Sequence, residues 1–135
     1  MSEARLDGCR ILVVDDDPDV LDSIALAIAS EGGEVVRATD GNTAVSLFNA
    51  HDPDAIVLDM MLPRRSGFLV LEKIRENDAP PPVVMVTANQ GRRHMEYAKG
   101  LGVAAYLVKP VSLSHLLDTL IDALDSADEP PFTIE

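Results

Sequence analysis

Cysteine and positive charge are both scarce in this sequence. The 135 residues include one cysteine, Cys9, which excludes an internal disulfide bond and makes a reducing cytoplasm the simplest setting. Lysine and arginine together number 11 against 23 aspartates and glutamates, so the formal net charge is −12. Because proteins bind nucleic acids through basic side chains that contact phosphates, this balance argues against a nucleic-acid partner.

Long apolar runs are missing as well. No stretch approaches the ~20 consecutive apolar residues of a membrane-spanning helix, so we expect no membrane association. Residues 1–5 show no signal-peptide pattern. Hydrophobic residues nevertheless make up 47% of the chain, which is typical of a folded protein. The length suits one domain with its own core.

Four short apolar runs each end at a polar residue. The runs at 11–14, 56–58, 83–86 and 104–108 lead into Asp15, Asp59, Thr87 and Lys109, respectively. Apolar runs without alternation are typical of strands that are covered on both faces of a parallel sheet. The carboxyl ends of parallel strands share one edge, where open α/β folds place their chemistry. We therefore expect the four polar side chains to lie close together.

Segments with helical spacing separate these runs and a further short strand at 34–38. The five predicted helices lie at about 18–30, 44–48, 67–77, 90–99 and 113–124, and residues 40–42 are predicted to form a turn. Five strands alternating with five helices predict an α/β fold with a doubly wound, five-stranded parallel sheet. The helix at 90–99 has few apolar residues, so we expect it to be the most mobile element. One domain at 9–126 is expected, with terminal tails at 1–8, where the chain should fray, and at 127–135.

Asp15, Asp16 and Asp59 are expected to form a carboxylate cluster. Two carboxylates about 4 Å apart repel each other by roughly 4 kcal/mol at an effective dielectric constant of 20, so three of them favour a bound cation. Oxygen ligands without histidine or cysteine suit Mg²⁺ or Mn²⁺ rather than zinc. A hard cation beside a carboxylate suits phosphoryl transfer, with Lys109 and Thr87 available to phosphate oxygens. Asp59 can itself be the nucleophile and form an acyl phosphate.

Each of these residues also has an ordinary structural interpretation. Asp16 and Asp17 can simply begin a helix, where acidic side chains interact favourably with the helix dipole. Asp59 can precede a turn, Thr87 can be a strand residue and Lys109 a surface residue. Their joint position at the ends of successive strands favours a functional site.

Five stretches give this pattern its specificity: 11–18, 56–63, 67–68, 86–88 and 106–110. In this order and spacing they make the chain similar to the receiver domain of bacterial response regulators, over about residues 9–126. The resemblance implies the flavodoxin-like strand order 2-1-3-4-5. It also implies a signalling switch that is activated by phosphorylation, rather than an enzyme in the ordinary sense, although such a domain catalyses its own phosphotransfer and dephosphorylation.

The resemblance assigns a role to each acidic residue at the strand ends. Asp59 would accept a phosphoryl group from a histidine kinase or a phosphotransfer protein. Asp15 and Asp16 would hold Mg²⁺, Asp16 directly and Asp15 mainly through water. The backbone carbonyl of Met61 would supply a further ligand. Met61 and Asn89 occupy variable positions that affect the lifetime of the acyl phosphate in this family.

The resemblance also predicts how the phosphorylated state differs. Lys109 and Thr87 would bind the phosphoryl oxygens, and Tyr106 would turn inward as Thr87 moves. The face formed by residues 90–124 would then change and control the binding of a downstream protein partner. A cis peptide bond is expected between Lys109 and Pro110.

Two other classes of protein are weighed against this interpretation. A haloacid-dehalogenase-type phosphatase also uses an aspartyl nucleophile with Mg²⁺, but it usually has a second acid two residues later, where this chain has Met61. A flavodoxin-like FMN binder needs a phosphate loop rich in Ser, Thr or Gly, where this chain has aspartates at 15–17. Residues 125–135 are too few for an output domain of about 50 residues or more, so we expect a stand-alone receiver or a piece of a longer protein.

Overall fold

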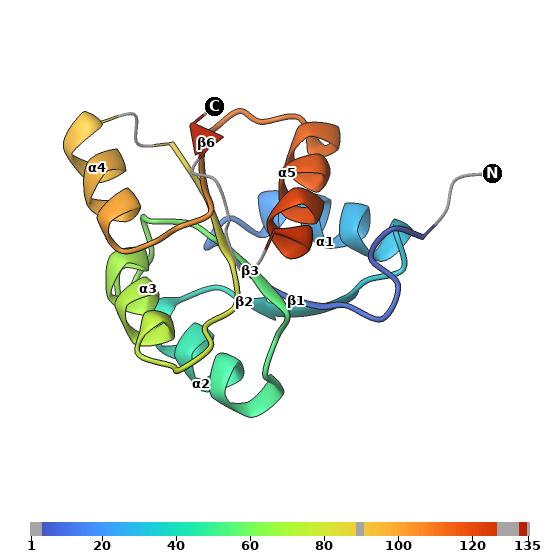
Figure 1. Ribbon diagram of the computed structural model, residues 1–135, viewed down its shortest axis with the longest axis horizontal. Coiled ribbons are helices and arrows are strands. Elements are labelled where there is room, and N and C mark those ends of the chain that lie inside the picture. Colours follow the sequence, from blue (N-terminus) through green and yellow to red (C-terminus); the bar gives the residue numbers. More distant parts are fainter. Residues whose placement is uncertain (1–3, 89–90, 127–132, 135) are drawn as a thin grey trace.

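Six parallel strands form one sheet in the order β2-β1-β3-β4-β5-β6 (Figure 1). The structure is a computed structural model that describes residues 4–88, 91–126 and 133–134. The strands are β1 (Arg10–Val14), β2 (Glu34–Ala38), β3 (Ala55–Leu58), β4 (Val83–Thr87), β5 (Ala105–Val108) and β6 (Thr133–Ile134). The first five strands have the predicted order 2-1-3-4-5, so the predicted doubly wound fold is confirmed.

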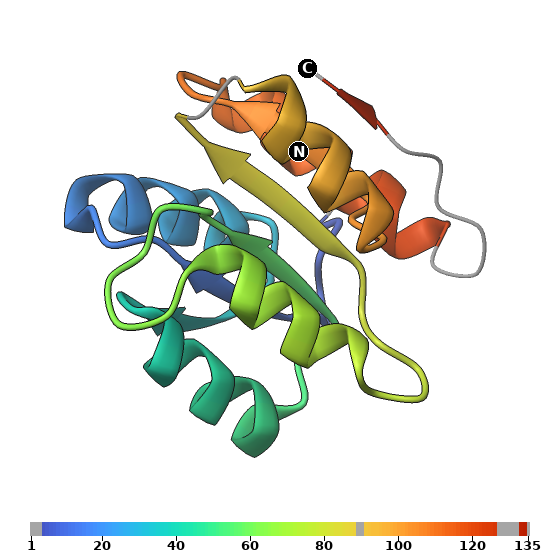
Figure 2. The same ribbon diagram turned by 90° about the vertical axis from the view of Figure 1, so that its left-hand side faces the viewer.

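Helices cover both faces of the sheet (Figure 2). They are α1 (Pro18–Ser30), α2 (Gly41–His51), α3 (Gly67–Arg75), α4 (Arg92–Gly100) and α5 (Leu113–Asp125). Alternate residues of one strand enter different cores: Val13 packs with α1 and α5, whereas Leu12 packs with α2, α3 and α4. Burial on both faces explains why the strand sequences are apolar without alternation. No helix among the described residues combines the length and apolar composition of a membrane span.

Four of the five helices begin at a side chain that accepts a hydrogen bond from the backbone of the first turn. These N-cap residues are Asp17, Asp40, Ser66 and Ser112. At α4 the N-cap is Gly91, which offers no side chain, and Ala98 is the fully buried residue of this helix. Helix α4 begins at Arg92 rather than at 90 as predicted; Gln90 and Asn89 lie outside the described residues. The expected mobility of α4 stays a prediction.

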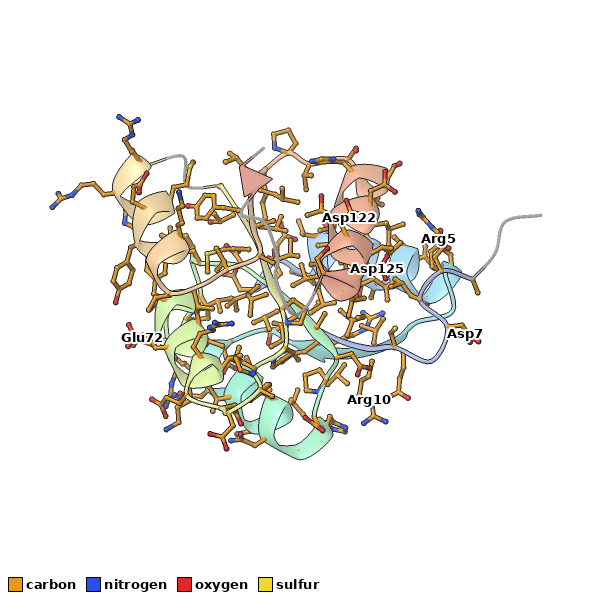
Figure 3. The ribbon with its side chains drawn as sticks, in the orientation of Figure 1. Arg5, Asp7, Arg10, Glu72, Asp122 and Asp125 are labelled. Atoms are coloured by element: carbon orange, nitrogen blue, oxygen red, sulfur yellow. The ribbon has the colours of Figure 1, made fainter. Side chains whose placement is uncertain are left out.

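Helix α4 is attached to α3 by an aromatic contact. The ring of Phe68 stacks on His94 with centroids 5.8 Å apart and meets the edge of Tyr97 at 5.0 Å. The Tyr97 hydroxyl donates to Glu72 Oε2 at 2.7 Å, and Figure 3 shows Glu72 on α3. These contacts hold a helix whose buried apolar surface is small.

Residues 4–8 were predicted to be part of a frayed tail, and this prediction is wrong. Leu6 is 0% exposed within the core beneath α1, and its N–H donates to the Glu31 carbonyl at 2.8 Å. The Arg5 guanidinium contacts Glu31 and Asp118 of α5, and Figure 3 shows Arg5 beside α1 and α5. A single apolar residue among polar neighbours carries no periodic signal, so only the tertiary contacts reveal this packing.

The sixth strand was not predicted. Strand β6 lies within the segment 127–135 that was expected to be a tail, and it pairs with β5 through Ala105↔Thr133 and Tyr106↔Ile134. Without it, β5 would present the backbone hydrogen-bonding groups of a sheet edge. Two residues are too short for an alternation pattern. Residues 127–132 and 135 lie outside the described residues, so the expected domain boundary there stays a prediction.

Candidate functional site

Two buried aspartates extend neighbouring strands by one residue at the carboxyl edge of the sheet. The Asp15 N–H donates to the Ala38 carbonyl at 3.1 Å, and the Asp59 N–H donates to the Val14 carbonyl at 3.0 Å. Asp15 is 2% exposed and Asp59 is 5% exposed. The strand ladders therefore hold both backbones rigidly, so the two carboxylates face each other from adjacent strand ends.

Three carboxylates meet at this edge, as predicted. Asp15, Asp16 and Asp59 each offer one oxygen, and these oxygens all lie within 4.8 Å of one another. The third consecutive aspartate has a different role, because Asp17 accepts hydrogen bonds from Asp19 N–H at 2.9 Å and from Val20 N–H at 3.4 Å. It therefore caps α1, whereas Asp15 and Asp16 contribute to the cluster.

Lys109 connects two of these carboxylates. Its ammonium nitrogen lies 2.8 Å from Asp15 Oδ2 and 3.3 Å from Asp59 Oδ2. The peptide bond between Lys109 and Pro110 is cis, as predicted. The lysine thus offsets part of the repulsion between the acids, an offset that was not predicted from the sequence.

The pKa values of Asp59 and Lys109 are both displaced from their ordinary values. Burial raises the pKa of Asp59, and the Asp15 charge adds to this; the Met61 N–H at 3.1 Å and the Lys109 ammonium oppose it without cancelling it. Burial alone would lower the pKa of Lys109, but the hydrogen bond to Asp15 and the charge of Asp59 raise it above its ordinary value. The ammonium form is therefore favoured between the two acids.

The two remaining candidates lie on β4 and β5, beside the cluster. Thr87 is 0% exposed at the end of β4, and its carbonyl accepts a hydrogen bond from Lys109 N–H at 2.9 Å. Tyr106 is also 0% exposed, opposite Met85 in the β4–β5 pairing. Burial raises the pKa of Tyr106, and the charge of Asp59 adds to this effect. The ring already lies in the interior, so the expected inward rotation of Tyr106 would require a different starting conformation and stays a prediction.

The family model of the response regulator receiver domain matches residues 11–121. This chain belongs to the response regulator receiver family. Receiver domains act as phosphorylation-dependent switches, and the family receives its phosphoryl groups from histidine kinases or phosphotransfer proteins.

Relatives and solved structures agree with this assignment. The chain is 38% identical over 120 residues to the transcriptional regulatory protein TrcR of Mycobacterium tuberculosis, covering 86% of this chain and 46% of the relative. It is 36% identical over 112 residues to PdtaR of the same species, covering 82% and 54%. The chain thus spans about half the length of these curated relatives.

Two solved receiver structures share the fold. A CheY-like receiver domain from Methanospirillum hungatei matches with a TM-score of 0.85 and 29% identity, covering 92% of this chain and 98% of that one. A chain of the CheX–CheY–BeF3–Mg complex from Borrelia burgdorferi matches with a TM-score of 0.83 and 25% identity, covering 89% and 96%. Strand order and helix placement therefore follow the receiver fold.

In this receiver domain the loop after β3 folds back on the phosphoacceptor candidate. Met61 donates its N–H to Asp59 Oδ1 at 3.1 Å, and Gly67 donates its N–H to the Met60 carbonyl at 2.8 Å. A Cβ atom on Gly67 would lie 2.3 Å from the Asp59 carbonyl oxygen, so only glycine permits this approach. The Met61 side chain is 60% exposed, and the role of its carbonyl stays a prediction.

The donor set of this receiver fits a hard divalent cation. Three carboxylates converge, and the cluster contains neither histidine nor cysteine. One lysine offsets one of three negative charges when all are ionised, so net negative charge remains for a cation. Oxygen donors at such a site suit Mg²⁺ or Mn²⁺.

One buried acid near the site was misinterpreted from the sequence. Asp40 was assigned to a turn, but its carboxylate is 5% exposed, caps α2 and contacts Arg64 of the β3–α3 loop. The spacing from Asp40 to Thr43 is an N-cap signal that could have located the helix start. The contact with Arg64 has no sequence signal.

Proposed function

We propose that this receiver domain is phosphorylated on Asp59 in a Mg²⁺-dependent reaction, with a histidine kinase or a phosphotransfer protein as donor. The observation that supports this most directly is that the buried carboxylates of Asp59 and Asp15 share one ammonium group. Asp59 and Asp15 are both nearly inaccessible, and one ammonium group, that of Lys109, contacts both. Burying like charges costs free energy, and clusters of this kind are typical of binding and catalytic sites.

The residues that would hold Mg²⁺ are Asp15, Asp16, Asp59 and the backbone carbonyl of Met61. When bound, Mg²⁺ would supply positive charge beside the phosphoryl oxygens, which is the main requirement of phosphoryl transfer. The Met61 N–H and Lys109 favour the ionised form of Asp59, which is the nucleophilic form. We therefore assign to these two donors the role of keeping Asp59 ionised for its attack on phosphorus.

In the transfer step, an oxygen of the Asp59 carboxylate attacks phosphorus. The phosphorus–nitrogen bond of a phosphohistidine breaks, and the histidine nitrogen leaves with the electron pair. Lys109, 3.3 Å from Asp59 Oδ2, can then follow the negative charge onto a phosphoryl oxygen, and the Thr87 hydroxyl is the second donor that we assign. Hydrolysis of the acyl phosphate at the same centre would return the domain to its starting state.

A phosphatase function receives less support. Aspartyl-nucleophile phosphatases usually carry a second acid two residues after the nucleophile, and Met61 occupies that position here. Its backbone N–H contacts Asp59, but its side chain cannot donate a proton to a leaving group.

The output of the switch would be a change on the face formed by residues 90–124, read by a downstream protein. Two observations support this face. Helix α4 lacks a side-chain cap and buries little surface, so its displacement would cost little free energy. Thr87 is the last residue of β4 and precedes Gly91, the N-cap of α4, by four positions in the chain. The matched relatives are named transcriptional regulatory proteins, and this chain spans about half of their length. That this chain binds a protein and no nucleic acid, and that it lies in the cytoplasm, stay our predictions.

Intact-mass measurement tests the phosphorylation directly. Incubation with acetyl phosphate and Mg²⁺ should add one phosphoryl group that is stable in acid and lost at high pH. Asp59→Asn should gain none, whereas Asp78→Asn, which changes an exposed aspartate, should label like the wild type. Full labelling of Asp59→Asn, or undiminished labelling in EDTA, would contradict the proposal. Amide exchange with and without beryllofluoride then tests whether the face formed by residues 90–124 responds most.

A further inference from the structure

The start of α2 contacts the loop between β3 and α3, which spans residues 59–66 (Figure 2). Three consecutive residues on each side take part: Asp40, Gly41 and Asn42 at the helix, and Pro63, Arg64 and Arg65 in the loop. We call this set the α2–loop clamp. Gly41 N–H donates to the Pro63 carbonyl at 3.2 Å, and Arg65 Nε donates to Asn42 Oδ1 at 3.1 Å.

The ion pair of the clamp contains a buried carboxylate. Asp40 is 5% exposed; it accepts hydrogen bonds from Thr43 N–H at 2.8 Å, the Thr43 hydroxyl at 3.0 Å and Arg64 Nη1 at 3.0 Å. The Thr43 N–H lowers the pKa of Asp40 despite its burial, and the Thr43 hydroxyl and Arg64 add to this. Arg64 has φ +67°, a left-handed conformation that side chains disfavour, so its contacts must compensate.

The backbones of the clamp are in direct contact. A Cβ atom on Gly41 would lie 2.0 Å from the Arg65 carbonyl oxygen, which is too close for any side chain. The loop therefore rests on the first residue of α2 without a gap. Any substitution at Gly41 has to displace either the helix or the loop.

The clamp holds the far end of the same loop whose near end lies against Asp59. At the near end, Met61 N–H contacts Asp59 Oδ1, and Gly67 N–H donates to the Met60 carbonyl. We propose that Asp40 and Arg64 are positioning residues of the phosphorylation site, which hold the loop so that the Met61 backbone stays in place beside Asp59. This inference rests on the proposed function, because it requires the Met61 carbonyl to be a ligand of the divalent cation.

Two substitutions break the ion pair and leave the cap in place. Asp40→Asn keeps an oxygen that can accept from Thr43 N–H, since asparagine caps helices as well as aspartate does, but it removes the charge that faces Arg64. Arg64→Gln removes the charge on the other side. Arg64→Lys retains a cation and should restore most of the wild-type behaviour. The matched control is Arg37→Gln, which removes an exposed arginine of β2 that pairs with Asp22 of α1.

The readouts are the Mg²⁺ dissociation constant of the unphosphorylated protein, measured by isothermal titration, and amide exchange in EDTA. Arg64→Gln makes the protein more negative, so charge alone would strengthen Mg²⁺ binding. The clamp predicts the opposite: a roughly two- to fivefold weaker affinity, the range expected for losing a largely exposed ion pair. The N–H groups of Gly41 and Met61 should exchange faster. The double variant should be no weaker than either single one, because both disrupt one interaction.

Each result separates this inference from the proposed function. If the wild type binds no Mg²⁺, the proposed function fails and the inference fails with it. If the wild type binds Mg²⁺ and Arg64→Gln binds it equally or more tightly, with Met61 exchange unchanged, the clamp does not position the loop, although the proposed function stands. A lower melting temperature with unchanged Mg²⁺ affinity would likewise reduce the pair to a structural role. Gly41→Ala should weaken Mg²⁺ binding more than either charge variant.

Discussion

Asp40 and Asp59 have the same small exposed fraction but lie in different surroundings. Each is 5% exposed and each follows the carboxyl end of a strand. The pKa of Asp40 is lowered, because Thr43 donates twice to its oxygens and Arg64 once. The pKa of Asp59 is raised, because burial and Asp15 outweigh the donors Met61 N–H and Lys109.

This difference separates an acid with a structural role from the acid that we propose as the phosphoacceptor. The interactions of Asp40 favour its ionised form, so its charge stabilises the fold. Those of Asp59 are incomplete, and its ionised form lies beside a second carboxylate in a site that can accept a cation. A low exposed fraction alone therefore says little about function, because desolvation and the donors around a carboxylate together set its pKa.

The largest expected effect that tests this comparison is stabilisation by Mg²⁺. At a hundred times its dissociation constant, a ligand that binds only the folded state stabilises it by about 2.7 kcal/mol, or roughly 10 °C in melting temperature for a domain of this size. Melting curves with Mg²⁺ and with EDTA measure this shift. Asp59→Asn should shift less because a ligand charge is gone. Equal shifts in both proteins would mean that Asp59 does not belong to the cation site.

The next effect concerns the structural acid. Asp40→Ala removes the cap of α2 and leaves the Thr43 N–H without its acceptor, so the melting temperature should fall by about 4 °C. Since the pKa of Asp40 is lowered in the folded state, its stabilisation is present at neutral pH and is lost as the pH falls through the folded value. Thermal melts across the acid range check this. A deficit that grows on acidification would refute the assignment.

The smallest effect has the opposite sign. Asp59→Asn should raise the free energy of unfolding in EDTA by roughly 0.5–1 kcal/mol, because it removes a repulsion that Lys109 already reduces. Since the pKa of Asp59 is raised in the folded state, the free energy of unfolding of the wild type falls as the pH rises from the ordinary aspartate range through the folded pKa. The two proteins should therefore be equally stable in acid and diverge toward neutral pH. Denaturant titrations at several pH values measure the difference; a less stable Asp59→Asn at neutral pH would contradict it.

Local patterns in the sequence determined the elements and the edge where the chemistry lies. Unbroken apolar runs marked four of the first five strands, and each of these four runs stopped at the residue that the structure places in the cluster or beside it. This worked because burial on both faces demands apolar residues throughout a strand, whereas the strand end is free to carry a polar one. The positions of Asp15, Asp59, Thr87 and Lys109 at one edge of the sheet therefore followed from order and spacing.

Contacts between distant segments were decided by the tertiary structure alone. Lys109 meets Asp15 across 94 residues of chain, and Arg64 meets Asp40 across 24. Leu6 is fully buried although its neighbours are polar, and β6 pairs with β5 although no sequence pattern predicts this strand. A periodic pattern reports only which face of an element is buried. Which charge offsets which, and whether a buried acid is stabilised or left reactive, depends on groups that folding brings together from separate parts of the chain.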